Sequence, residues 1–112
     1  MMNVQAALTA AGVPGYRGAF ISSPEQPEPP DVYAVYTCTR QPIFASDDQA
    51  RAMKVRVFLH LYARGDPTEP AAAVQTAMAA EGFCFTREME AFVEESGLYE
   101  TLSEWEAADY AA

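Results

Sequence analysis

Long hydrophobic runs are missing from this sequence of 112 residues. No apolar stretch approaches the ~20 residues that a membrane-spanning helix needs, and the first residues lack the basic flank and apolar centre of a signal peptide. We therefore expect a soluble protein that begins its life in a cytoplasm. Cysteine and histidine are also scarce: the sequence contains only Cys38, Cys84 and His60. These three residues lie far apart. This spacing argues against a zinc site and a disulfide framework, so we expect free thiols, no metal and no other cofactor.

Basic residues are few, with 7 Lys and Arg against 16 Asp and Glu and a net charge of -9. Such a balance argues against a protein that grips phosphates, so nucleic acid is not an expected ligand. The imbalance is concentrated late in the chain, where residues 65–112 carry Arg87 alone against eleven acids. A solvated acidic face explains this asymmetry, and so does a surface that repels DNA or meets a basic partner.

Half of the residues are hydrophobic and 12% are aromatic, which predicts one folded domain over residues 1–112. Apolar residues at helical spacing predict a helix over 2–11, with Asn3 as its N-cap and Gly12 as its stop. Residues 16–21 favour a short strand, and the proline-rich segment 22–31 favours an extended loop.

Two further strands are predicted over 32–39 and 53–64. The second strand alternates cleanly, but its less apolar face mixes charges with Phe58 and Tyr62, which predicts partial cover by a helix, a loop or another subunit. Residues 40–52 are expected to form a long, mobile polar connection between the strands. Within it, Phe44 offers an apolar anchor for a partner.

The last third of the chain predicts a helix from Thr68, as the N-cap, to about Ala80, with Gly82 just beyond its end. Strands over 83–93 and 98–106 then form a hairpin around a turn at 94–97. The order is α-β-β-β-α-β-β. It predicts an α+β fold in which two helices pack on one face of an antiparallel or mixed sheet of about four to five strands.

Residues that could carry catalysis are isolated in the sequence. His60 has no serine, cysteine or aspartate arranged around it, and the adjacent Asp47 and Asp48 diverge instead of converging on one point. We therefore expect a protein that is not an enzyme. The final hairpin interleaves glutamates with aromatic residues, which fits either a wet surface hairpin or an edge that pairs with a neighbouring copy.

Taken together, these segments resemble the small tail terminator, or tail completion, proteins of long-tailed bacteriophages and prophages. The resemblance spans nearly the whole chain and is strongest in the final hairpin. It is carried by Val13-Pro14 with Tyr16 and Phe20, Val32 to Tyr36 after the proline-rich loop, Phe44-Ala45 with Asp47-Asp48, Val55-Arg56-Val57 to Leu61-Tyr62, Asp66-Pro67, Ala79 to Phe83, Glu88, Glu94-Glu95, Gly97-Leu98-Tyr99 and Glu104-Trp105-Glu106.

The resemblance implies a structural virion protein that caps the tail tube, stops its growth and joins the tail to the head. Its implied partners are further copies of itself, typically in a homo-hexameric ring, the tail tube protein and the head connector; DNA passes through the ring without specific binding, and no membrane is involved. It implies residence in the host cytoplasm during assembly and in the tail or neck of the particle afterwards. We assign the partner interface to Phe44, Asp47, Asp48, Glu94, Glu95 and Glu100. Two other classes remain: an acidic DNA mimic that inhibits a DNA-binding enzyme, and a small hydrolase that uses the carboxylates.

Overall fold

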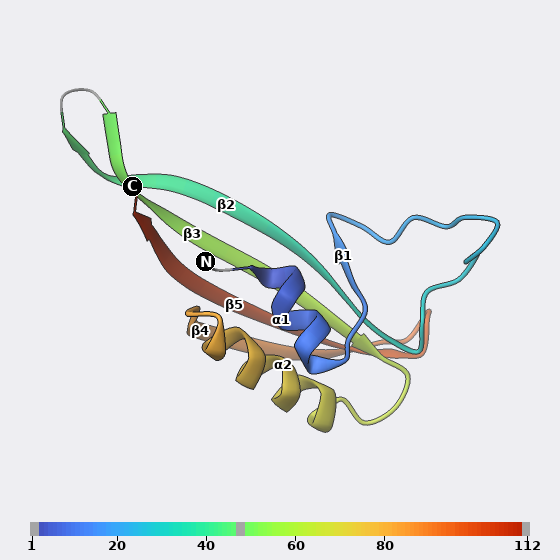
Figure 1. Cartoon of the computed structure of the whole chain (residues 1–112). Coiled ribbons are helices and arrows are strands. Elements are labelled where there is room, and N and C mark those ends of the chain that lie inside the picture. Colours follow the sequence, from blue (N-terminus) through green and yellow to red (C-terminus); the bar gives the residue numbers. More distant parts are fainter. Residues whose placement is uncertain (1–2, 47–48, 111–112) are drawn as a thin grey trace.

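The computed structural model describes residues 3–46 and 49–110, and for 43–46, 49–51 and 109–110 it describes the backbone alone. Two helices and five strands form an α+β fold (Figure 1). In chain order they are α1 (Val4–Ala11), β1 (Gly15–Arg17), β2 (Val32–Ser46), β3 (Gln49–Ala63), α2 (Thr68–Ala80), β4 (Cys84–Val93) and β5 (Leu98–Tyr110). This order confirms the predicted α-β-β-β-α-β-β arrangement.

The five strands form one mixed sheet in the order β1-β2-β3-β5-β4. The short β1 pairs parallel to β2 over three residues, and every other pairing is antiparallel. At the centre, β3 pairs with β2 on one side and with β5 on the other, from Ala52 to Ala63. The sheet is therefore a continuous ladder whose two outer strands are β1 and β4.

Both helices lie on the same face of the sheet, as Figure 1 shows, and they also contact one another. Beneath them, Leu59 and Trp105 are almost completely buried, together with Leu8 from α1 and Met78 from α2. The indole N–H of Trp105 donates to Ser103 Oγ at 2.9 Å, so its burial leaves no unpaired donor. One hydrophobic core thus fixes both helices to β3 and β5.

The ends of the helices show which local signals operate. Asn3 caps α1 as predicted, because its side chain accepts from Ala6 N, and Gly12 ends the helix with φ +74°. The predicted N-cap of α2 is wrong by position: Thr68 is already helical, and its backbone N–H donates to Asp66 Oδ1 at 3.0 Å. Pro67 is the N-cap and makes no side-chain capping bond, so the Asp66 carboxylate, one residue before it, accepts from the first helical N–H instead.

The predicted connection over 40–52 is replaced by strands. β2 continues to Ser46 and β3 begins at Gln49, with a register shift near Phe44, so that a two-stranded ribbon extends beyond the helices (Figure 1). A polar composition was interpreted as a loop, but a ribbon without a helix above it has no face that must be apolar. Residues 47 and 48 lie outside the described part of the chain.

Gly15 lies where β1 passes closest to α1. A Cβ placed on it meets Leu8 Cδ1 at 2.4 Å and Gln5 Oε1 at 3.2 Å. Leu8 is fully buried and cannot turn away into solvent. The absence of a side chain at position 15 therefore permits this close packing of helix against strand.

We predict that Gly15→Ala lowers the free energy of unfolding by about 1–3 kcal/mol, because the added methyl group overpacks this contact. Gly65→Ala is the matched control, since a Cβ there meets no atom within 4 Å, and its effect should stay within about 0.5 kcal/mol. Urea denaturation of both variants measures the difference. Equal free energies of unfolding for the two variants would show that α1 and β1 can move apart without loss of stability.

Candidate interaction surface

The sheet face turned away from the two helices is the main candidate for a functional surface, and we call it the open face. Alternation along the strands assigns residues to it, because Val57, Leu59 and Leu61 point into the core and their neighbours point away. The helices α1 and α2 cover the opposite face (Figure 1). The register places on the open face Tyr16, Tyr33, Val35, Lys54, Arg56, Phe58, His60, Tyr62, Arg87, Met89, Glu100, Leu102, Glu104 and Glu106.

Aromatic rings gather at one end of the open face. The ring of Tyr33 stacks on that of Tyr62 at 5.0 Å between centroids, and Tyr16 meets Phe20 edge to face at 5.1 Å. Tyr33 also lies 6.2 Å from Tyr16 and 6.3 Å from Phe20, so the rings form one cluster. Burial raises the pKa of both Tyr33 and Tyr62 above the usual 10.0. Phe20, from the segment after β1, packs on Tyr16 and Tyr33 at the β1–β2 side of this face.

His60 continues this cluster toward the centre of the sheet. Its ring lies nearly parallel to that of Tyr62, with 6.3 Å between centroids, and its Nδ1 lies 2.8 Å from Glu100 Oε1. Glu100 faces Tyr62 in the register, so the contact with His60 runs diagonally between β3 and β5. This arrangement gives His60 a structural partner on the neighbouring strand.

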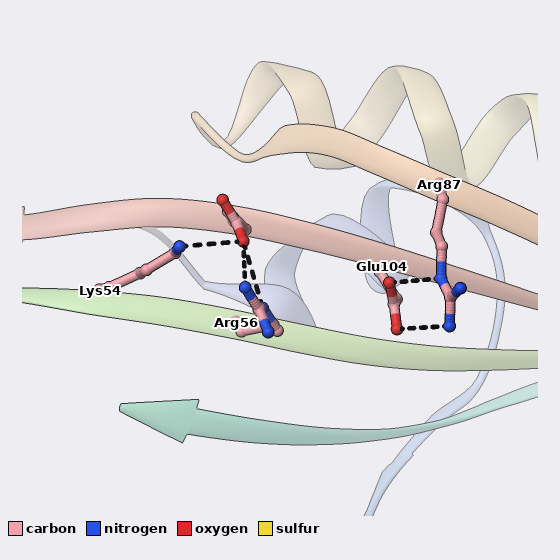
Figure 2. A network of polar contacts seen from close by, with 5 residues as sticks. Lys54, Arg56, Arg87 and Glu104 are labelled. Carbon is pink, nitrogen blue, oxygen red and sulfur yellow. Dashed lines mark hydrogen bonds and ion pairs between the residues drawn. The ribbon is translucent and has the colours of Figure 1, made fainter. Parts of the chain in front are cut away.

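Ion pairs lie farther along the open face (Figure 2). Glu106 Oε1 accepts from Arg56 Nη2 at 2.6 Å and lies 3.3 Å from Lys54 Nζ. Arg87 reaches from β4 to β5, with Nε 2.6 Å from Glu104 Oε2 and Nη2 3.2 Å from Glu104 Oε1. The second contact engages both carboxylate oxygens, a geometry that favours arginine over lysine.

These pairs change the electrostatic character of the open face. Its three carboxylates, Glu100, Glu104 and Glu106, each contact His60 or a cationic side chain. The chain as a whole carries a net charge of -9, so most of its unbalanced acids lie elsewhere. A charge-balanced, partly aromatic face inside an acidic protein is a surface that another protein can approach without strong repulsion.

The outer strand β4 is the second exposed feature. Nine of its ten residues are exposed, with Val93 half-buried, and they include large apolar side chains: Phe85 is 51% exposed, Met89 56% and Phe92 52%. Phe85 packs its ring edge to face on Trp105 at 5.1 Å, and Phe92 lies 5.0 Å from Tyr99. Each ring thus contacts its own chain on one side and presents the other side to solvent. Exposed apolar side chains on both faces of an edge strand make β4 a candidate interaction site.

The described part of the surface carries open hollows. The hollow between α2 and β4 has a volume of about 190 Å³ and is lined by polar groups that include Thr68, Gln75, Glu88 and Thr101. Gln75 donates to Glu88 across it. Within residues 3–46 and 49–110, no three His, Cys, Asp or Glu side chains gather as metal ligands do. The same residues contain no helix with the length and hydropathy of a membrane span.

The residues predicted to form a partner interface do not come together. Phe44 lies in the ribbon near the far end of β2, where the structure describes the backbone alone, and Asp47 and Asp48 are outside the described residues. Glu94 and Glu95 are exposed in the turn between β4 and β5, at the opposite end of the long sheet. Glu100 is half-buried in its contact with His60. The described residues of the predicted interface are therefore divided between two ends of a molecule 51 Å long.

Sequence reasoning missed the pairing of charges across the sheet. The alternation of Lys54 and Arg56 with aromatic residues was recognisable, as was the run from Glu100 to Glu106. Their partnership depends on the register between β3 and β5, which opposes Arg56 to Glu106. Opposite charges at alternate positions of two strands were a signal for this pairing, but only a known register identifies the partners.

We predict that Arg56→Met raises the pKa of Glu106, because the hydrogen bond from Arg56 is the main reason that this pKa lies below its usual value of 4.5. Lys54→Met is the control and should raise it less, since Lys54 lies farther away. Because the pKa of Glu106 is lower in the folded state, its carboxylate stabilises the protein at pH values above the unfolded-state pKa. This stabilisation is lost as the pH falls through the folded-state pKa. Carboxyl NMR titration of Glu106 measures the shifts. An unchanged pKa in Arg56→Met would contradict the pairing.

No protein-family model matches the chain, and no curated protein matches it. The argument for function therefore depends on the surfaces themselves.

Proposed function

We propose that the chain is a structural subunit that caps a bacteriophage tail tube, ends its growth and joins the tail to the head connector. In this proposal, identical copies assemble as a ring, and the sequence resemblance implies that this ring is hexameric. Assembly takes place in the host cytoplasm, and the finished ring resides at the neck of the particle. The ring's partners are the tube protein on one side and the connector on the other, while DNA passes through without specific binding.

The observation that carries the proposal is the exposed edge strand β4. A subunit that works alone usually protects such an edge with charge, proline or a covering element. Here Glu88 and Glu90 provide charge, but no element covers the edge, which also presents Phe85, Met89 and Phe92 to solvent. Assembly provides the missing cover, and a ring of identical subunits is one way to cover the same edge in each copy.

The open face supports an assembling subunit over a DNA mimic. A mimic needs unpaired carboxylates arranged like phosphates along one face. Glu104 and Glu106 instead pair with Arg87, Arg56 and Lys54, which balances the charge of the open face. Balanced charge on this scale favours contact with protein rather than imitation of a polyanion.

We predict that the protein binds the ends of tail tubes and not their sides. Purified protein mixed with tubes of its own phage or prophage should give capped ends in negative-stain electron microscopy and should stop further tube growth. Double replacement of Phe85 and Met89 by serine should reduce end binding, while replacement of the exposed Ile21 by serine serves as a control outside β4. Tubes that grow normally in the presence of excess protein would overturn the proposed function.

We also predict that Glu94→Lys with Glu95→Lys slows DNA ejection without preventing assembly. Both side chains are exposed in the β4–β5 turn, and acidic side chains along a channel repel DNA within about 8 Å at physiological salt. Glu100 stays unchanged because it contacts His60. The control is Glu25→Lys with Glu28→Lys, which makes the same charge change in the proline-rich loop. Normal ejection by both doubly substituted particles would show that the turn does not line the channel.

A further inference from the structure

The sheet has a second exposed edge besides β4. On the other side of the sheet, β1 pairs with β2 only at Ala34, Val35 and Tyr36, whereas β2 itself continues to Ser46. Within the described residues, no strand of this chain pairs with the outer side of β2 beyond Tyr36. One molecule therefore carries two strand edges, at opposite sides of one sheet.

The hydrogen bonds to β1 reveal which backbone groups face outward on β2. Ala34 N donates to Pro14 O at 2.8 Å, and Tyr36 O accepts from Gly18 N at 2.9 Å. Even-numbered residues thus direct their backbone groups away from β3, and the regular register with β3 carries this alternation from Cys38 to Pro42. Proline lacks an N–H, so Pro42 removes a donor from the outer edge and not from the ladder with β3. The stretch that a partner strand can use is therefore 37–41.

Two β4 strands fit one another poorly. Glu88 faces Ser103 and Glu90 faces Thr101 in the register, so both glutamates lie on the helix-bearing side of the sheet. A two-fold antiparallel pairing of β4 with itself that is centred here opposes Glu88 to Glu90, or opposes one of them to its own copy. Like charges directly opposite each other destabilise a strand pair.

We infer that β4 of one copy adds as an antiparallel strand to residues 37–41 of β2 in the next copy; this inference deepens the proposed function and rests on it. Successive antiparallel pairings make β4 antiparallel to β2 within one sheet. A second copy in the same orientation therefore presents β2 in the correct direction, with the two open faces aligned. The two sheets join along this stretch of β2, and β1 of the next copy keeps its own place on β2 at Ala34 to Tyr36.

Charge determines the register of this contact. Arg40 faces Val55, which packs against the core, so Arg40 lies on the helix-bearing side as Glu88 and Glu90 do. With Glu88 opposite Arg40, Glu90 lies on the diagonal from Arg40 and opposite Cys38. Opposite charges across a strand pair stabilise it, and they replace the repulsion that a β4–β4 contact suffers.

Such a contact is directional and repeats. It uses the β4 edge of one copy and the β2 edge of the next, so every added copy again offers one edge of each kind. Contacts of this type close into a ring when the rotation between neighbours closes, and otherwise they extend as a filament. The two edges thus supply the subunit contact that the proposed ring requires.

A charge exchange tests the contact in the full-length protein without tail tubes. Arg40→Glu, and separately Glu88→Lys with Glu90→Lys, should each weaken self-association by about tenfold or more. Combining all three substitutions in one chain should restore association to near the wild-type value. The controls Arg17→Glu, and Glu25→Lys with Glu28→Lys, make the same charge changes at exposed positions outside 37–41 and β4. Sedimentation velocity at physiological salt gives the dissociation constants, and circular dichroism checks that each variant is folded.

Restoration in the triple variant supports the β4–β2 contact, because a β4–β4 contact would place lysines opposite lysines there. An unaffected Arg40→Glu variant, a triple variant that stays dissociated, or a wild-type chain that remains monomeric at about 1 mM would each overturn the inference. The outcome is separable from the proposed function. Capped tubes with an unaffected Arg40→Glu variant would leave the function standing without this contact, whereas restored association without tube capping would leave the contact standing without the function.

Discussion

The structure depends on a mismatch between the sheet and its helices. β3 pairs with both neighbours along its length and forms the centre of a five-stranded sheet, but α1 and α2 contribute only 8 and 13 residues to cover it. Two short helices bury one face around Leu59 and Trp105 and leave the other face without a second layer. The ribbon of β2 and β3, the open face and the edge of β4 all follow from this limited cover.

The open face is adapted to its exposure in two ways. At one end, Tyr33 and Tyr62 stack and bury part of each other's surface. Elsewhere, Arg87 and Arg56 hold the carboxylates of β5 and neutralise them. Cross-strand contacts therefore replace part of the stabilisation that a covering layer would supply, and they leave a surface of balanced charge in a protein with a net charge of -9.

The edges complete this picture because the proposed contact between copies depends on them. A sheet with β4 exposed on one side and β2 incompletely covered by β1 on the other has two different ends. Glutamates on β4 disfavour pairing with an identical strand, and Pro42 limits the usable length of β2. Charges and proline protect lone edge strands from aggregation. In the proposed contact, the same residues favour pairing of β4 with β2 over pairing of β4 with itself.

The sequence by itself determined the type and order of the elements, because alternation over 53–64, helical spacing over 68–80, and the stops at Gly12 and Gly82 are local signals. It misassigned 40–52, where a polar composition suggested a loop although β2 and β3 continue as a paired ribbon, and it placed the N-cap of α2 at Thr68 rather than at Pro67. The candidate surface was decided by the tertiary structure. Which carboxylate meets Arg56, which face the helices cover and where β1 leaves β2 exposed all depend on strand order and register, which arise from contacts between residues far apart in the chain.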